Sequence, residues 1–183
     1  MQVDESSLLR LLADEKTQRK GFAILVNTYS EMLYKQIRRM VLNHEDTNDI
    51  LQNTFIKAWQ GLSSFEGRSH ISSWLYRIAM NEAYDFMRRK KEQSSLSDEQ
   101  GEGASIASRL MADEYFDGDE TSAQLQQVIQ ELPYVQRTVF QLRYFENKKY
   151  AEISEILGTS EGALKASYHI AVQKITEFFK SRD

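Results

Sequence analysis

The sequence contains no cysteine and only one proline, Pro133, among its 183 residues. Without cysteine there can be neither a disulfide framework nor a thiolate metal site, and such a composition fits a reducing compartment. The eight glycines are scattered along the chain. Chain breakers this sparse favour long helices over many short strands. We therefore expect a helical protein without cysteine chemistry.

Two kinds of hydrophobic segment are also missing. The N-terminal stretch MQVDESSLLRLLADEK is acidic and lacks the basic-then-apolar order of a signal peptide. No apolar run approaches the length of a membrane span. Hydrophobic residues make up 41% of the chain, which is enough for packed cores in one ordinary domain or two small ones. These features predict a cytoplasmic protein without direct membrane insertion.

Charge is distributed unevenly, although the net charge is only −4. Residues 68–92 carry 6 basic and 3 acidic groups, whereas residues 93–120 carry 1 basic and 8 acidic groups. A local basic patch can hold phosphate whatever the total charge, because salt screens charges beyond about 8–10 Å. A solvated basic face beside a solvated linker is the alternative interpretation of this pattern.

Apolar residues recur at three- and four-residue steps in two sets of segments, and this spacing predicts amphipathic helices. The first set covers 22–41, 50–62 and 71–87. The second set covers 125–132, 135–144, 153–157 and 164–178. Ser69 or Ser72 is a candidate cap for the helix over 71–87, and Pro133 suits the first turn of the helix that follows it.

The segment 93–120 separates the two sets of helices. It is rich in serine, glycine and acidic residues and has no sustained periodicity, so we expect a linker that is flexible at least in part, with room for a short helix. The predicted fold class is therefore all-α. It consists of two small helical domains, 1–92 and 121–183, joined by a flexible acidic linker, and the second contains a helix-turn-helix.

The segment YAEISEILGTSEGALKASY, residues 150–168, predicts that helix-turn-helix. Gly158 suits a left-handed turn residue, and Ser160 is a good N-cap for the next helix. The start of that helix would lie in a DNA major groove. Its side chains that could face bases or phosphates are Ser160, Glu161, Lys165, Ser167 and His169. An ordinary helical hairpin is the alternative.

A second candidate segment, RSHISSWLYRIAMNEAYDFMRRKK, covers residues 68–91. It combines an apolar stripe with arginines, lysines, tyrosines and an asparagine. Aromatic and amide groups can hold the bases of an opened strand while cations follow its backbone. An amphipathic helix with a basic, solvated end is the alternative.

These segments together resemble the extracytoplasmic-function (ECF, group IV) sigma factors of the sigma-70 family. WLYRIAMNEAYDFMRRKK looks like the family's promoter −10 segment, and DTNDILQNTFIKAWQGLSSFEG, residues 46–67, resembles its core-polymerase-binding segment. Residues 132–175 resemble the domain that reads the −35 element. The three segments occur in the family's order, and the resemblance covers roughly residues 20–92 and 121–180.

The resemblance implies a role for particular residues. Those of the polymerase-binding helix would be Asp49, Gln52, Asn53, Phe55 and Trp59. Those that read the −10 element and capture a flipped base would be Ser63, Arg68, His70, Ser73, Trp74, Arg77, Asn81 and Arg88. Phe55, Trp59 and Trp74 have the spacing of core residues as well, so a packing role stays open for each.

For the −35 element, the resemblance adds Lys174 to the five residues of the helix-turn-helix. The chain departs from the family here, because Ser167, Ile170 and Val172 stand where relatives often carry arginine. Fewer cations imply weaker and less salt-sensitive phosphate binding. In the family, the linker also threads into the polymerase, and the acidic charge of residues 93–120 is consistent with that path. A solvated tether between the two domains would explain the same acidic charge equally well.

The expected partners are core RNA polymerase, promoter DNA and, as the resemblance implies, an anti-sigma factor of the membrane-anchored kind common in the family. No cofactor, metal or catalytic residue is expected, because His44, His70 and His169 lack metal-ligand spacing and no glycine-rich phosphate loop or nucleophile elbow occurs. The competing hypotheses are a helix-turn-helix regulator that binds duplex DNA alone, an enzyme with scattered site residues, and a helical adaptor, which would not need the basic segment.

Overall fold

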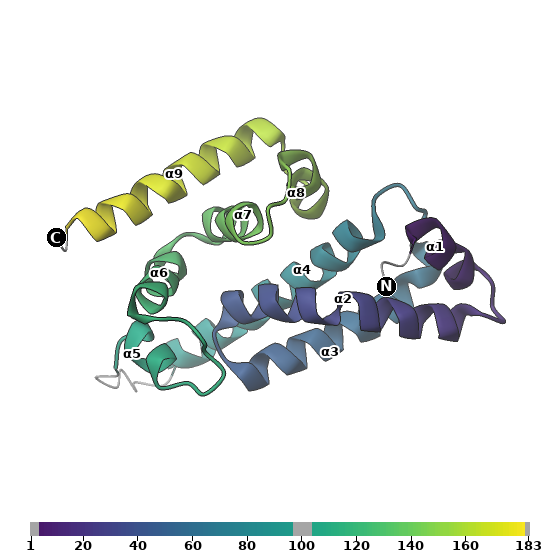
Figure 1. The fold of residues 1–183 in the computed structure, drawn as a ribbon, viewed down its shortest axis with the longest axis horizontal. Helices are drawn as coiled ribbons and strands as arrows, with labels where there is room; N and C mark the ends of the chain where they lie inside the picture. The colour runs from purple at the N-terminus through teal and green to yellow at the C-terminus, as the bar shows by residue number, and fades with distance from the viewer. Residues whose placement is uncertain (1–3, 97–103, 182–183) are drawn as a thin grey trace. The chain divides into compact units, whose positions relative to one another are not determined.

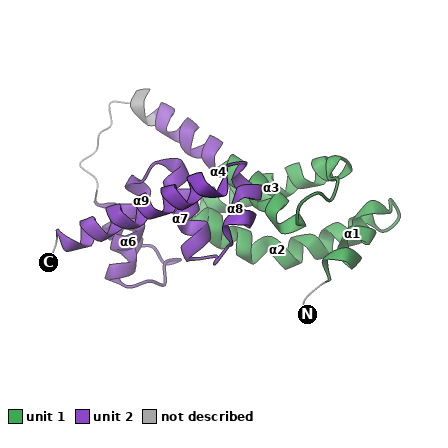
Figure 2. Ribbon diagram, turned by 90° about the horizontal axis from the view of Figure 1, so that it is seen from above, with its two compact units in different colours: residues 1–83 green, residues 84–183 purple. Residues whose placement is uncertain are grey.

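The computed structural model of the chain describes residues 4–96 and 104–181, and every regular element in these ranges is helical. The described chain divides into two compact units, Met1–Ala83 and Tyr84–Asp183, with the division inside one long helix (Figure 2). Figure 1 shows the elements in chain order. The all-α prediction is confirmed.

The first unit is built from the helices α1 (Glu5–Ala13), α2 (Gln18–Val41) and α3 (His44–Gly61), the 3-10 turn Leu62–Ser64, and the first half of α4 (Ile71–Leu96). Each helix presents an apolar stripe to a shared core, whose fully buried members include Leu8, Leu25, Leu33, Ile37, Met40, Ala58, Ile71, Leu75, Tyr76 and Met80. The predicted stripes over 22–41, 50–62 and 71–87 therefore correspond to α2, α3 and α4.

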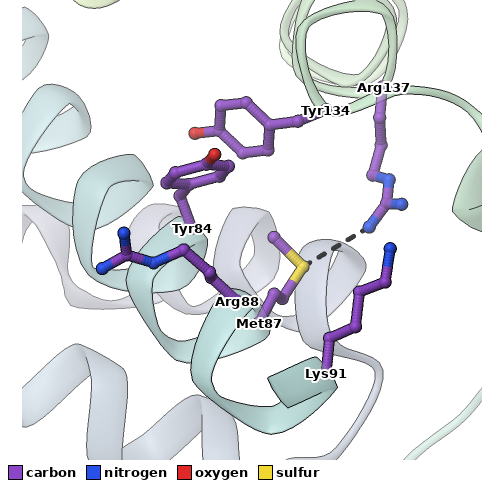
Figure 3. Close-up of a pocket in the computed structure, with 6 residues that line it drawn as sticks. All are labelled: Tyr84, Met87, Arg88, Lys91, Tyr134 and Arg137. Atoms are coloured by element: carbon purple, nitrogen blue, oxygen red, sulfur yellow. Dashed lines mark hydrogen bonds between the residues drawn. The ribbon is translucent and has the colours of Figure 1, made fainter. Parts of the chain in front are cut away.

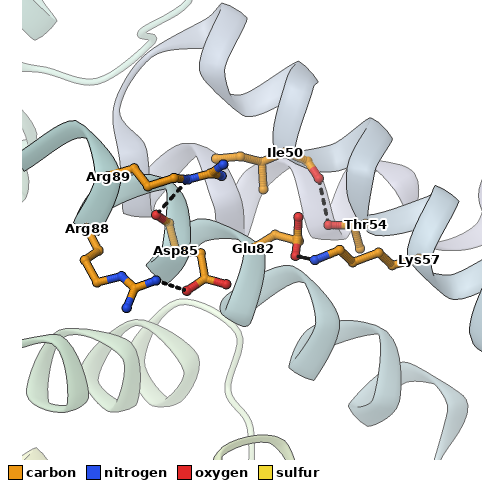
Figure 4. A network of polar contacts seen from close by, with 7 residues as sticks. All are labelled: Ile50, Thr54, Lys57, Glu82, Asp85, Arg88 and Arg89. Atoms are coloured by element: carbon orange, nitrogen blue, oxygen red, sulfur yellow. Dashed lines mark hydrogen bonds and ion pairs between the residues drawn. The ribbon is translucent and has the colours of Figure 1, made fainter. Parts of the chain in front are cut away.

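Polar contacts fix α4 against α3. The Lys57 ammonium of α3 pairs with the Glu82 carboxylate of α4, whose side chain is largely buried. One turn before Lys57, the Thr54 hydroxyl donates to the Ile50 carbonyl at 2.7 Å. Figure 4 shows both contacts. Because a buried carboxylate without a partner is costly, this ion pair favours one rotation of α4.

The second unit contains α5 (Ile106–Met111), α6 (Glu120–Glu131), α7 (Tyr134–Tyr144), α8 (Tyr150–Leu157) and α9 (Glu161–Lys180). Its core cluster consists of buried residues of α6, α7 and α9, namely Val128, Ile129, Leu132, Phe140, Ala171 and Ile175. Pro133 occupies the cap position before α7, one residue earlier than predicted. There its missing N–H leaves no helical hydrogen bond unmade.

The segment between the two predicted domains contains more helix than the sequence indicated. Helix α4 continues to Leu96, so it extends past the predicted start of the linker at residue 93, and α5 lies within the predicted linker. The Ser105 side chain caps α5 by accepting the Ser108 N–H at 3.1 Å. Residues 97–103 of the predicted linker lie outside the described residues.

Candidate nucleic-acid and polymerase interfaces

One side of α4 carries a row of exposed polar and aromatic side chains. Arg77, Asn81, Tyr84 and Arg88 are all exposed and follow one another at steps of four, three and four residues. At about 100° per residue, these steps keep them on one face of the helix. The structure thus brings three of the residues predicted for −10 DNA onto one surface and adds Tyr84 between them.

The neighbouring side of α4 is buried and includes one residue that the sequence assigned to the DNA-facing set. Ser73 is only 1% exposed, and Tyr76, Met80 and Ala83 continue the same stripe at three- and four-residue steps. Its hydroxyl is therefore part of the packed side of the helix. The physical reason is that the first turns of α4 lie in the core of the unit, where only a narrow strip stays at the surface.

The loop before α4 carries three further predicted contacts, Ser63, Arg68 and His70, and all three are exposed. The loop is fixed near its start by the Phe65 ring, which packs on Trp74 with centroids 4.9 Å apart. Trp74, predicted as either a contact or a core residue, is partly buried against this loop. The Arg68 guanidinium pairs with Glu66 at 2.6 Å, with both side chains exposed.

The start of α4 is capped differently from the prediction. The Ile71 N–H donates to the Glu5 carboxylate of α1 at 2.8 Å, and Ser72 lies inside the helix. Ser69 and Ser72 were the candidates because serine caps helices locally. A carboxylate from a helix 66 residues earlier takes this place instead, and sequence spacing gives no signal for such a contact.

Ion pairs and one pocket surround the C-terminal half of the same helix. Arg88 pairs with Asp85 at 3.4 Å, and Arg89 Nε donates to the Asp85 carbonyl at 3.3 Å (Figure 4). In the second unit, a pocket of about 320 Å³ is lined by Tyr84, Met87, Arg88, Lys91, Tyr134 and Arg137 (Figure 3). The rings of Tyr84 and Tyr134 lie 4.5 Å apart within it.

The buried groups of this pocket serve the fold. Arg137 donates to the Gln130 side chain at 2.8 Å and to the Leu132 carbonyl at 3.2 Å, so it satisfies groups at the end of α6. Burial lowers the pKa of Arg137 and raises the pKa of Tyr134. The Arg137 guanidinium is committed to the C-terminal end of α6 through its hydrogen bonds.

Helix α3 presents a second surface with mixed chemistry. Asp49, Gln52 and Asn53 are exposed on one face together with Ile56, which is 49% exposed. The sequence analysis missed Ile56. The spacing of Ile56 could have identified it: it lies four positions after Gln52 and three after Asn53, so it shares a helix face with these polar residues. An apolar centre with a polar rim is the arrangement found in protein interfaces, although a single exposed apolar side chain does not by itself mark one.

Phe55 and Trp59 flank this face and pack against α2. The Phe22 ring lies 5.0 Å from that of Trp59 and 6.4 Å from that of Phe55, in edge arrangements. Phe55 is partly buried, but Trp59 remains 40% exposed. Trp59 thus packs on α2 on one side and reaches the surface on the other, so its predicted polymerase contact stays a prediction.

The helix-turn-helix forms as predicted. Helix α8 ends at Gly158, which has φ 65° and donates its N–H to the Ser154 carbonyl at 2.8 Å, and the Ser160 side chain caps α9 by accepting the Ala163 N–H at 3.4 Å. A left-handed residue at this position favours glycine. Ile153 and Leu164 are fully buried at the helix crossing, and Ile156 is buried beside them, whereas Leu157 is only partly buried.

The predicted −35 contacts lie on different sides of α9. Lys165 pairs with Glu161 at 4.0 Å and its ammonium lies 5.6 Å from the centre of the Tyr150 ring. Lys174 donates to the Gln136 side chain of α7 at 3.1 Å. Nine residues at about 100° each place Lys174 half a turn from Lys165. Ser160 and His169 are exposed, while Ser167 is partly buried.

The described residues hold no group of three or more histidine or acidic side chains placed to bind a metal ion. Among the helices that the structure describes, none has the length and apolar character needed to cross a bilayer.

Comparison with known proteins identifies the family to which this chain belongs. Residues 25–93 match the family model Sigma-70 region 2, and residues 122–175 match Sigma-70, region 4. The chain is therefore a sigma-70 class transcription initiation factor. It belongs, more narrowly, to the extracytoplasmic-function sigma factors, because it is 35% identical over 167 residues to the ECF RNA polymerase sigma factor SigW of Bacillus subtilis, covering 87% of this chain and 89% of SigW.

A further relative agrees in family, and two solved structures agree in fold. The chain is 29% identical over 168 residues to the RNA polymerase sigma-H factor of Pseudomonas aeruginosa, covering 83% of this chain and 82% of that factor. CnrH, solved with the cytosolic domain of CnrY, matches with a TM-score of 0.73 at 20% identity, over 98% of this chain and 99% of CnrH. RpoE of Bartonella quintana, solved with the anti-sigma factor NepR, has a TM-score of 0.71 at 23% identity, over 88% and 98%.

Proposed function

We propose that this sigma factor binds core RNA polymerase through α3, reads and traps melted −10 DNA with α4 and the loop before it, and reads the −35 element with α9. The observation that carries this proposal is the row Arg77, Asn81, Tyr84 and Arg88 on one exposed face of α4. Arginines can follow a backbone while an amide and an aromatic ring hold unpaired bases. An ion pair between Lys57 of α3 and the largely buried Glu82 carboxylate supports the helix that presents them.

The polymerase contact is assigned to Asp49, Gln52 and Asn53 with Ile56 and the exposed part of Trp59. Mixed amide, acidic and aromatic character with an apolar centre suits a specific protein interface. The −10 set is Ser63, Arg68, His70, Arg77, Asn81 and Arg88, with Tyr84 added and the buried Ser73 omitted. Trp74 supports the loop through Phe65. The captured base would lie against residues 63–70, where binding offsets the cost of unstacking.

In this proposal, the domain 1–92 binds the polymerase and the −10 element. The domain 121–183 binds the −35 element. The acidic segment 93–120 joins them and enters the polymerase. The factor acts in the cytoplasm and itself makes or breaks no bond, since its role is to bind and melt promoter DNA. An anti-sigma factor holds it inactive by covering the α3 face, a partner suggested by the family and by the complexes of RpoE with NepR and CnrH with CnrY.

The test mixes the purified protein with bacterial core RNA polymerase and follows complex formation by size-exclusion chromatography. Run-off transcription from a genomic promoter library then identifies its promoters. We expect a stable complex that starts RNA at sites sharing one −35/−10 pair. Direct binding to duplex DNA without polymerase, together with no core complex, would instead favour a free-standing helix-turn-helix regulator and contradict the proposal.

Lys165→Ala is expected to weaken promoter use through the −35 element. Lys165 is exposed near the start of α9, and one lost phosphate contact lowers the slope of log Kobs against log salt by about 0.9 on duplex DNA. The measurement is transcription from the identified promoter at several salt concentrations. Lys180→Ala removes an exposed cation at the far end of α9 and serves as control. An unchanged salt slope in Lys165→Ala would show that Lys165 makes no such contact.

A further inference from the structure

The loop proposed to hold the captured base ends in a contact with the N-terminal helix. One oxygen of the Glu5 carboxylate accepts the Ile71 N–H at 2.8 Å, and the other lies 3.0 Å from His70 Nδ1. The first N–H groups of a helix have no partner within the helix. A single carboxylate therefore caps α4 and orients the last side chain of the loop at the same time.

Helix α1 supplies this carboxylate from a fixed position. Asp4 caps its start by accepting the Ser7 N–H at 3.0 Å. Leu8 and Leu12 are buried. At Gly21, an added Cβ would come within 2.9 Å of Leu11 Cβ, so glycine there allows α2 to approach α1 closely.

The other end of α1 is also held. The Thr17 hydroxyl donates to the Leu11 carbonyl at 2.9 Å, and the Gln18 side chain donates to the Leu12 carbonyl at 3.1 Å. The last carbonyls of a helix have no partner within the helix, and these two contacts satisfy them. The C-terminal end of α1 is thus tied to the start of α2, and its buried leucines hold the helix in the core, which keeps Glu5 near the start of α4.

The loop itself is anchored at two points and exposed between them. Near its start, Phe65 packs on Trp74, and the Ser64 hydroxyl donates to the Gly61 carbonyl at 2.8 Å. At its end, Glu5 binds His70 and Ile71. Between these anchors lies Gly67 with φ 68°, a left-handed conformation that favours glycine. The conformation of the exposed part is therefore set by the two anchors.

We propose that Glu5 is a positioning residue for the −10 loop: it fixes His70 and the start of α4 so that the loop is preformed for the captured base. This inference rests on the proposed function. Glu5 itself would not touch DNA, because a carboxylate next to phosphates is repelled and both of its oxygens are occupied by the protein. Its effect passes through the loop, since a preformed site binds without an ordering cost.

The test compares full-length Glu5→Ala and Glu5→Gln with wild type and with Glu15→Ala, which removes an exposed carboxylate just beyond α1. Each protein is assembled with core polymerase, and the holoenzyme is titrated with a single-stranded oligonucleotide of the non-template −10 element from the promoter identified above. An abasic site moved through the element first locates the captured base in wild type. Thermal unfolding of each free protein is measured in parallel.

We expect Glu5→Ala to bind the intact oligonucleotide on the order of tenfold more weakly than wild type. On the oligonucleotide that lacks the captured base, it should match wild type, because no base remains for the loop to hold. On the intact oligonucleotide, the affinity of Glu5→Gln should fall between those of Glu5→Ala and wild type, since its amide oxygen can still accept the Ile71 N–H. Glu15→Ala should behave as wild type on both.

Two results would overturn the inference. Equal binding of the intact oligonucleotide by Glu5→Ala and wild type would remove any positioning role. An equal loss on the intact and abasic oligonucleotides would assign Glu5 to general stability, and Glu5→Gln makes the same comparison if Glu5→Ala does not fold. Failure of wild type itself to bind core polymerase would contradict the proposed function, a result distinct from a defect confined to the variants.

Discussion

Replacing both Arg77 and Arg88 with alanine is expected to lower holoenzyme affinity for the single-stranded −10 element on the order of 100-fold. Both arginines are exposed on the same face of α4. Hydrogen bonds to charged groups contribute about 1.5–3 kcal/mol each, so losing two contacts, partly compensated by water and salt, leaves a loss of roughly 2–3 kcal/mol. The measurement is oligonucleotide titration of the holoenzyme.

Salt dependence distinguishes this loss from a folding defect. Each phosphate contact to a single strand contributes about 0.7 to the slope of log Kobs against log salt, so the double variant should lose about 1.4. Arg19→Ala with Lys20→Ala removes two exposed cations from α2, away from this face of α4, and provides the matched control. An affinity within twofold of wild type and an unchanged slope would exclude this face of α4 as the strand-binding surface.

Leu33→Ala is expected to destabilise the first unit by about 2–5 kcal/mol, because it opens a cavity in a packed core. Leu33 is 0% exposed in the middle of α2, among the helices that carry both the polymerase and −10 surfaces. A small domain has a total free energy of unfolding of about 5–15 kcal/mol, so the expected loss is a large share of that total. Urea unfolding measures the free energy, and amide hydrogen exchange locates it.

The loss of stability in Leu33→Ala should be confined to one of the two units. Faster exchange should be confined to buried amides of the first unit, while the cluster around Ile129 and Phe140 in the second unit keeps its protection. Ile56→Ala provides the control, because a side chain 49% exposed leaves no closed cavity and should cost about 0.5 kcal/mol or less. Uniform loss of protection in both units would contradict two separate cores.

Much of the fold follows from local sequence signals. Apolar periodicity located the helices of both units, and Gly158 and Ser160 set the turn of the helix-turn-helix because each acts on its own backbone. Element ends were less predictable. Helix α4 continues to Leu96 through charged residues that form no apolar stripe but favour helix.

The sites were predictable where one helix face defines them. Arg77, Asn81 and Arg88 share a face by spacing alone. Spacing does not decide the position of Ser73, which lies four residues before Arg77 and three before Tyr76, and only its burial in the structure assigns it to the packed side. Contacts between distant segments were not predictable. Glu5 binds His70 across 65 residues, and its role depends on how α1 packs, which a single sequence does not encode in any short motif.

The environments of the two tryptophans have a spectroscopic consequence. Trp59 is 40% exposed beside the proposed polymerase face, whereas Trp74 lies under Phe65 at the base of the −10 loop. Both indoles belong to the first unit, so the tryptophan emission of the protein, excited selectively over tyrosine, reports on that unit alone. A Trp59→Phe variant would leave an emission that follows the loop, and a Trp74→Phe variant one that follows docking. The chain thus carries a separate optical reporter for each of its two proposed first-unit surfaces, without any attached dye.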